Sequence, residues 1–172
     1  TIPNSVTEIG ESAFNGCSAL TGTILSNSIT EISKSLFSGC SNLTSIVIPE
    51  GVISIGVNAF ANCTELATIE LPSTLKTIDI SAFVSCSSSK NVYYNGSMDD
   101  WFDVYLATSG STPMGDGSSN RFYVKSVGSS TFNGTSTYRG IDYYSITTLN
   151  MPNITKINNY QFIGFSQLDE IN

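Results

Sequence analysis

Apolar residues recur along the first half of the chain at one constant interval, the spacing that separates Phe14 from Phe37. A phenylalanine column is followed at a fixed offset by a cysteine column, with the members Phe14, Phe37, Phe60, Phe83 and Cys17, Cys40, Cys63, Cys86. Isoleucine and leucine columns keep the same phase, at Ile9, Ile32, Ile55, Ile78 and at Leu20, Leu43, Leu66. Several columns in phase do not arise by chance, so the chain is expected to consist of stacked copies of one unit.

Each unit is expected to contain one short parallel strand, because apolar and polar residues alternate in it before a recurring proline. Ile46 and Ile48 should point into the core, since side chains alternate across a strand. Ser45 and Val47 should then point outward. Pro49 should end the strand, because proline cannot donate to the hydrogen-bond ladder.

The segment that carries the phenylalanine is expected to be a single helical turn. Ser12 or Asn58 precedes an Ala-Phe pair and is of a residue type that caps helices. Gly16 and Gly39 follow and should turn the chain back. One unit alone cannot bury its apolar residues, whereas stacked units make a continuous core with the phenylalanine column as its spine.

The repeat pattern divides the chain, which is expected to form one continuous solenoid, into three parts. Residues 1–94 are regular repeats and residues 95–121 are a non-repeat insertion. In residues 122–172 the repeats are degenerate at first and then recover. In the last part, residues 122–124 are expected to form a strand, and Thr131 to Gly134 echoes the phenylalanine turn. Residues 146–168 return to a coil whose columns hold Met151, Pro152, Ile157, Phe162 and Leu168. The chain begins and ends within a repeat, which we interpret as an excerpt of a longer protein.

A short helix is expected within the insertion, laid over the solenoid. Ser97 is a capping residue followed by early carboxylates, and Trp101, Val104 and Tyr105 recur at helical spacing. Residues 108–120 are rich in serine, glycine and threonine and predict a surface loop.

The unit has a Leu-x-x-Ile-x-Leu core, and its length of about 23 residues lies in the range of leucine-rich repeats. The run from Ile55 to Pro72, with its Ala59-Phe60 pair and Cys63, resembles the BspA-type leucine-rich repeat of surface proteins in bacteria and some parasitic protists. The turn at residues 94–97 before a tryptophan resembles an interruption common in that family. The resemblance implies a right-handed solenoid of stacked coils with turns and single-turn helices. It also implies an extracellular or cell-surface adhesion protein without an activity of its own.

Composition and charge argue against several function classes. The formal net charge is -7 and no basic run is present to follow a phosphate backbone, so nucleic acid is not an expected partner. No stretch approaches the roughly 18 apolar residues of a membrane span. The chain contains no histidine, which excludes Ser-His and Cys-His catalysis. Its carboxylates follow no motif, so neither an enzyme nor a cofactor is expected.

The cysteine column invites a metal or disulfide interpretation. A zinc site needs four ligands that converge on one point, whereas these thiols are spread along the solenoid with one in each coil. Adjacent coils lie about 4.8 Å apart, which a disulfide can bridge. We favour small buried thiols, and the sequence leaves open whether they are free or paired. Calcium is not expected either, because the spacing of a calcium loop is missing at Asp99, Asp100, Asp103 and Asp116.

The favoured function is recognition of a macromolecule, a host or cell-surface protein or else a glycan, through the strand face and the insertion. Ile24, Val47 and Tyr93 are apolar or aromatic at outward strand positions, where solvent exposure is expected. The candidate contact residues are Ile24, Val47, Glu70, Tyr93, Trp101 and Tyr105. One alternative is a passive spacer of a surface protein, which needs no apolar patch. Another is a carbohydrate-binding module, which needs a cleft with stacked aromatics.

Overall fold

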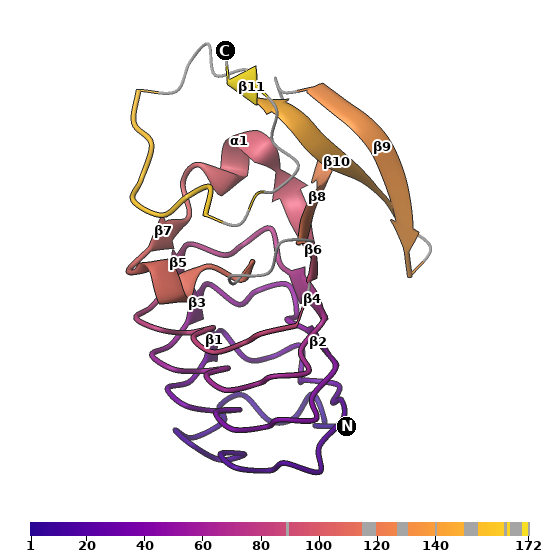
Figure 1. The fold of residues 1–172 in the computed structure, drawn as a ribbon. Coiled ribbons are helices and arrows are strands. Elements are labelled where there is room, and N and C mark those ends of the chain that lie inside the picture. The colour runs from indigo at the N-terminus through magenta and orange to yellow at the C-terminus, as the bar shows by residue number, and fades with distance from the viewer. Residues whose placement is uncertain are drawn as a thin grey trace.

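The computed structural model describes residues 1–88, 90–114, 120–126, 131–139, 141–149, 155–163, 165 and 170–171. The chain winds from the N-terminus through stacked coils, with parallel strands on two sides of the stack (Figure 1). The fold is the predicted leucine-rich-repeat solenoid. Within the described residues, helical structure is confined to α1 (Met98–Trp101) and the 3-10 helix η1 (Ser109–Ser111). No helix there is long and apolar enough to cross a membrane.

The larger sheet runs along the side that carries the predicted strands. Its strands are β2 (Ser45–Val47), β4 (Thr68–Leu71), β6 (Asn91–Ser97), β8 (Arg121–Ser126), β10 (Ile141–Leu149) and β11 (Glu170–Ile171), with β9 (Thr131–Tyr138) paired to β10. Ile46 pairs with Ile69 and Ile69 with Val92, so apolar side chains of successive coils stack in register. The predicted alternation is confirmed, because Ile46 and Ile48 are buried while Val47 is partly exposed.

A second, smaller sheet lies on the other side of the coils. It consists of the parallel strands β1 (Glu31–Ile32), β3 (Ser54–Ile55), β5 (Thr77–Ile78) and β7 (Tyr105–Leu106). Ile32, Ile55 and Ile78 point into the core and are fully buried. The coils in this region therefore have a second strand beside the single one predicted. A strand of two residues is too short to show an alternation in the sequence, which is why it was missed.

The segment that carries the phenylalanine is a turn, and the predicted capped helical turn is wrong. The residue at its start has a positive φ, between 55° and 60°, in Ser12, Ser35, Asn58 and Ser81. Alternate N–H groups donate to the next coil, as from Phe14 N to Leu36 O at 3.0 Å. The intervening groups close turns within the coil, as from Asn15 N to Ser12 O at 3.0 Å. A continuous helix keeps its N–H groups for its own carbonyls, so this bonding between coils excludes it.

The phenylalanine column forms the predicted spine of the core. Its rings stack nearly parallel, with centroids 5.4 Å apart for Phe14 and Phe37, 5.5 Å for Phe37 and Phe60, and 5.1 Å for Phe60 and Phe83. Aromatic pairs in such contact contribute about 0.5–1.5 kcal/mol each beyond the burial of their surface. The spine therefore ties successive coils together through side chains as well as through backbone bonds.

The cysteine column consists of free thiols. The buried thiols donate to phenylalanine carbonyls of the preceding coil, with Cys40 Sγ 3.1 Å from Phe14 O and Cys63 Sγ 3.1 Å from Phe37 O. Burial raises the pKa of Cys86 to about 11 and also raises the pKa values of Cys40 and Cys63. The thiols of Cys40, Cys63 and Cys86 act as small buried packing groups, as favoured from the sequence, whereas Cys17 is exposed.

Residues 95–121 contribute strands to both sheets. Ser97 caps α1 through reciprocal hydrogen bonds with Asp100, so the start of the predicted short helix is confirmed. The helix ends at Trp101, and Tyr105, which was expected on it, lies in β7. β7 pairs with β5, and Asn91 of β6 pairs with Arg121 of β8. The segment forms a lengthened coil, with α1 in its path between β6 and β7. Of the predicted loop at 108–120, residues 115–119 lie outside the described part of the chain.

A hairpin replaces one of the predicted turns in the last part of the chain. Residues 122–124 lie in β8 as predicted, but Thr131 to Gly134 belong to β9, which pairs antiparallel with β10. The prediction of a phenylalanine turn there is wrong. Threonine and aromatic residues over β9 suit a strand, and Arg139 has the positive φ, 52°, of a tight hairpin turn.

A coil returns after the hairpin, because Thr148 of β10 pairs in parallel with Glu170 of β11. Phe162 of this coil is half-buried and packs against the core, as its column predicts. Ile157 is exposed, so its assignment to a core column is wrong. Residues 146–149 lie in β10, so the strand that ends the hairpin also begins the returning coil. Met151, Pro152 and Leu168 lie outside the described residues.

Candidate functional site

The outward face of the larger sheet carries one continuous column of side chains. Val47 pairs with Glu70, Glu70 with Tyr93, and Tyr93 with Tyr123, while Ile24 precedes them in the same column. The column begins in the open, because Ile24 is 67% exposed and Val47 is partly exposed. The exposure predicted for these two residues is therefore confirmed.

The upper part of the column is covered by the β9–β10 hairpin, which stands out from the sheet and curves down along it (Figure 1). Tyr93 is only 7% exposed, so its predicted exposure is wrong. Its ring stacks on Tyr123 and Tyr138 with centroid distances of 5.0 and 4.3 Å, and meets Tyr143 edge-on at 5.0 Å. Two of these three rings come from the hairpin, whose return onto the sheet cannot be read from the repeat.

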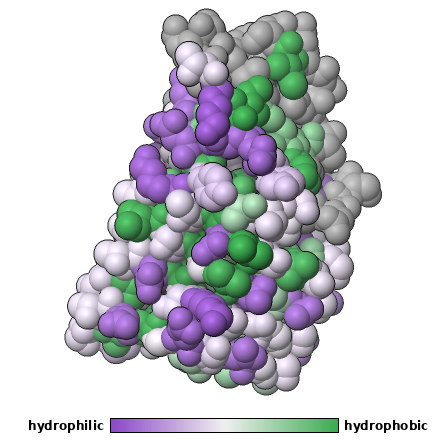
Figure 2. Space-filling view, turned by 90° about the vertical axis from the view of Figure 1, so that its left-hand side faces the viewer, coloured by the Kyte–Doolittle hydropathy of each residue, from purple (hydrophilic) through white to green (hydrophobic). Residues whose placement is uncertain are grey.

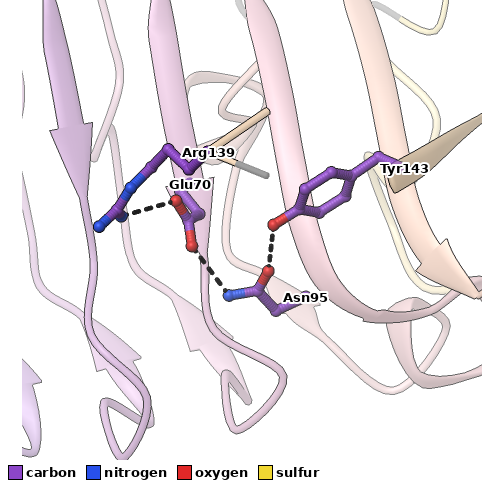
Figure 3. A network of polar contacts seen from close by, with 4 residues as sticks. All are labelled: Glu70, Asn95, Arg139 and Tyr143. Atoms are coloured by element: carbon purple, nitrogen blue, oxygen red, sulfur yellow. Dashed lines mark hydrogen bonds and ion pairs between the residues drawn. The ribbon is translucent and has the colours of Figure 1, made fainter. Parts of the chain in front are cut away.

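A polar network joins Glu70, Asn95, Arg139 and Tyr143 (Figure 3). Arg139 Nη1 lies 3.1 Å from Glu70 Oε2, and Asn95 Nδ2 donates to Glu70 Oε1 at 3.2 Å. Tyr143 Oη donates to Asn95 Oδ1 at 2.5 Å. Burial and the negative charge of Glu70 raise the pKa of Tyr143, which keeps its hydroxyl protonated as a donor. Both carboxylate oxygens of Glu70 therefore have a donor although the residue is only 7% exposed.

Four elements bring these residues together. Glu70 lies on β4, Asn95 on β6 and Tyr143 on β10, and Arg139 follows the last residue of β9. The positive φ of Arg139 turns the chain at the hairpin tip, which places its guanidinium against the sheet. The network thus connects the tip of the hairpin to the face of the solenoid.

A pocket of about 600 Å³ opens between the lower part of this face and the hairpin tip. Its lining residues include Ile24, Val47, Pro49, Glu50, Glu70 and Arg139. We call it the groove. Ile24 and Val47 give it an apolar floor, Glu50 lies on its rim, and the Glu70–Arg139 ion pair closes one end. Its volume lies within the range of about 300–1,000 Å³ that is usual for ligand sites.

Glu50 carries the charge on the rim of the groove. Its Oε1 accepts from Ser73 N at 3.2 Å and its Oε2 from Ser73 Oγ at 2.9 Å. Both donors are neutral, and the side chain is exposed. Among the described residues, the groove therefore presents one carboxylate that forms no ion pair, beside a second carboxylate that is paired with Arg139.

Two of the predicted contact residues lie elsewhere. Trp101 is fully buried in the core, where its Nε1 donates to Gln161 O at 3.3 Å. Tyr105 is 54% exposed, but it belongs to β7 of the smaller sheet. The six residues chosen from the sequence thus divide into three at the groove, one under the hairpin, one in the core and one on the opposite sheet.

The sequence reasoning missed Asn95, Arg139, Tyr143 and Glu50. The pairing of Glu70 with Arg139 joins residues 69 positions apart, and nothing in the repeat links them. One signal was present: Arg139-Gly140 stands between two segments rich in threonine and aromatic residues, a pattern typical of a hairpin.

The side of the smaller sheet has scattered exposed apolar residues. Ile53 and Ile80 are 52% and 50% exposed. Figure 2 looks onto this side and shows hydrophobic areas interspersed with hydrophilic ones. Single exposed apolar residues are ordinary on protein surfaces. These isoleucines therefore serve best as controls for the apolar floor of the groove.

The described residues contain no group of three or more histidine, cysteine, aspartate or glutamate side chains that could hold a metal ion.

Residues 1–104 match the BspA type leucine rich repeat region, in six copies. The chain belongs to this family. A solved structure of a leucine rich cell surface protein from Faecalibacterium prausnitzii A2-165 is similar to the BspA-type chain, with 43% sequence identity and a TM-score of 0.58. The similarity covers 59% of this chain and 27% of that one, so the chain spans about a quarter of the length of the surface protein. No curated protein matches the chain.

The BspA-type repeats form most of the groove, and a later part of the chain completes it. Ile24, Val47, Glu70 and Asn95 all fall within the matched residues, whereas Arg139 follows them. The hairpin thus adds a closing wall to a face that the repeats provide.

Proposed function

We propose that this BspA-type repeat chain is a non-enzymatic recognition module of a cell-surface protein, and that it binds a protein partner in the groove. The observation that carries the proposal is the apolar floor: Ile24 is 67% exposed inside a pocket closed by an ion pair. An exposed apolar surface rimmed by polar groups is typical of an interaction site.

The energetics of the groove favour a partner that buries its floor. Complete burial of an aliphatic side chain such as Ile24 stabilises a complex by about 1.5–3 kcal/mol. The Glu70–Arg139 pair and Glu50 give the groove polar edges, which orient a ligand that the apolar floor attracts. An apolar floor with a few fixed polar groups is the arrangement expected of a recognition site.

A protein partner fits the groove better than a sugar. The described residues that line it include no aromatic ring, whereas the carbohydrate alternative needs rings on which a sugar can stack. The four clustered tyrosines are packed against one another between the hairpin and the sheet.

Surface location and the lack of enzymatic activity have other support. The first rests on similarity to a leucine rich cell surface protein. The second rests on the BspA-type family and on a sequence without histidine.

The test is an array of extracellular-matrix proteins and glycans, probed with the native chain and with the double variant Ile24→Ser, Val47→Ser. The double variant should lose binding, because the floor loses its apolar surface. The control is Ile53→Ser, Ile80→Ser, which removes two similarly exposed isoleucines from the rest of the surface and should bind normally. Thermal unfolding of all three proteins checks that each is folded.

Equal binding by the native chain and the groove variant would refute the groove as the binding site. Glycan hits without protein hits would favour the carbohydrate-binding alternative. No hit for any of the proteins would favour the passive spacer.

A further inference from the structure

The groove is lined by more negative than positive side chains. Glu50 and Glu70 contribute two carboxylates, and Arg139 contributes one guanidinium. The 3.1 Å ion pair neutralises Glu70 with Arg139, whereas Glu50 accepts only from the neutral donors of Ser73. The uncompensated charge of the groove is therefore the exposed carboxylate on its rim.

The charge of the whole chain acts in the same direction. Its formal net charge is -7, so a cationic segment is attracted at long range and an anionic one is repelled. Complementary charge of this kind determines the choice of partner and the rate of association more than the affinity itself. The groove thus adds a charge preference to the apolar attraction of its floor.

The floor and the rim are also close in the chain. Val47 on β2 is followed two residues later by Pro49 and then by Glu50, all of which line the groove. An extended peptide presents alternate side chains on one face about 6.6 Å apart. Such a peptide can place one side chain on the floor while the next on the same face reaches towards the carboxylate.

Resting on the proposed function, we infer that the groove accepts an extended peptide segment with an aliphatic side chain and, two positions away, a lysine or arginine. The aliphatic group contacts Ile24 and Val47, and the cation pairs with Glu50. The Glu70–Arg139 pair limits the length of the segment at one end of the groove.

The test uses three fluorescein-labelled peptides with blocked termini, Gly-Ser-Leu-Ser-X-Ser-Gly, in which X is lysine, serine or glutamate. Fluorescence anisotropy with the whole chain at low salt should show the lysine peptide binding about fivefold more tightly than the serine peptide, the upper range for an exposed ion pair. The glutamate peptide should bind most weakly. High salt should reduce the difference, because it screens exposed charges.

Two variants locate the charge preference. Glu50→Gln should bring the lysine and serine peptides to the same affinity, since the amide keeps the shape and removes the charge. Glu31→Gln is the matched control, because Glu31 is an exposed carboxylate on β1 of the smaller sheet, and it should keep the lysine preference. Circular dichroism confirms that both variants are folded.

The outcomes separate this inference from the proposed function. Equal binding of the three peptides, or tighter binding of the glutamate peptide through Arg139, overturns the charge preference. If Ile24→Ser, Val47→Ser still abolishes array binding in that case, the groove stands as a binding site. Failure of all three peptides to bind also overturns the inference. Peptide binding that Ile24→Ser, Val47→Ser does not weaken contradicts both the inference and the proposed function.

Discussion

Glu70 is the one charged residue in a column whose other members are aliphatic or aromatic. A carboxylate at 7% exposure costs several kcal/mol to desolvate unless it is paired and hydrogen-bonded. Arg139 pairs with one of its oxygens, and the amide of Asn95 donates to the other. Arg139 therefore has two effects, because it neutralises Glu70 and attaches the hairpin tip to the sheet.

Substitution of Arg139 should show the cost of leaving Glu70 unpaired. Arg139→Gln should lower the free energy of unfolding by about 1–2 kcal/mol, less than for a fully buried pair because the arginine side chain is 57% exposed. Adding Glu70→Gln should recover part of the loss, since the uncompensated charge is then removed. Urea denaturation measures both.

The exposed ion pair Lys34–Glu11, 3.7 Å long, supplies the control. Lys34→Gln should change the free energy of unfolding by less than about 0.5 kcal/mol. The coupling of Glu70 with Arg139 is contradicted if the double variant Arg139→Gln, Glu70→Gln loses as much free energy of unfolding as its two single variants together.

The phenylalanine turn is the element that distinguishes this solenoid from the one predicted. Its alternate N–H groups bond to the next coil, which requires a left-handed residue at the start of each turn. Serine and asparagine occupy these positions in the chain. Asparagine tolerates the left-handed region better than most residues, whereas a β-branched side chain is strongly disfavoured there.

Ser35, with φ 55°, should therefore respond selectively to substitution. Ser35→Val should destabilise the chain by about 1–2 kcal/mol, because a β-branched residue strains a left-handed backbone. Ser35→Gly should be neutral or slightly stabilising, since glycine adopts positive φ without strain. Ser38→Val, three residues later and without positive φ, is the matched control. Comparable losses from both valine variants in urea denaturation would argue against strain as the cause.

The whole molecule combines a stack of coils with a hairpin laid on one face. Stability in a solenoid comes mainly from contacts between neighbouring repeats, here the phenylalanine spine and the two sheets. The hairpin adds contacts through the four tyrosines and the Glu70 network. We therefore expect the hairpin to open without unfolding the coils below it.

Tyr138→Ser tests whether the hairpin opens independently of the coils, because it removes the ring that stacks 4.3 Å from Tyr93. Hydrogen exchange measured by mass spectrometry should rise in β9 and β10, since an aromatic pair of this kind contributes about 0.5–1.5 kcal/mol. Exchange in β2 and β4 should stay unchanged. Tyr105→Ser, at an exposed tyrosine on the smaller sheet, should leave the hairpin unchanged. Faster exchange throughout the chain would show instead that hairpin and coils unfold together.

Much of the repeat could be predicted because each unit places like residues on like residues. The phenylalanine spine, the thiol column and the inward Ile46 and Ile48 follow from the constant interval of the repeat. The exposure of Ile24 and Val47 follows from the alternation of a strand. The second strand and the left-handed turns did not follow, because they are short and depend on bonds between coils.

The coils and the apolar floor of the groove follow from local pattern, since both depend on neighbours at a fixed interval along the chain. Which outward residues stay open and which are covered depends instead on how distant segments pack. The hairpin folds back over Tyr93 and brings Arg139 to Glu70, 69 residues away, and no local pattern encodes that contact. The groove results from this return, because a face of repeats alone has no wall at its end.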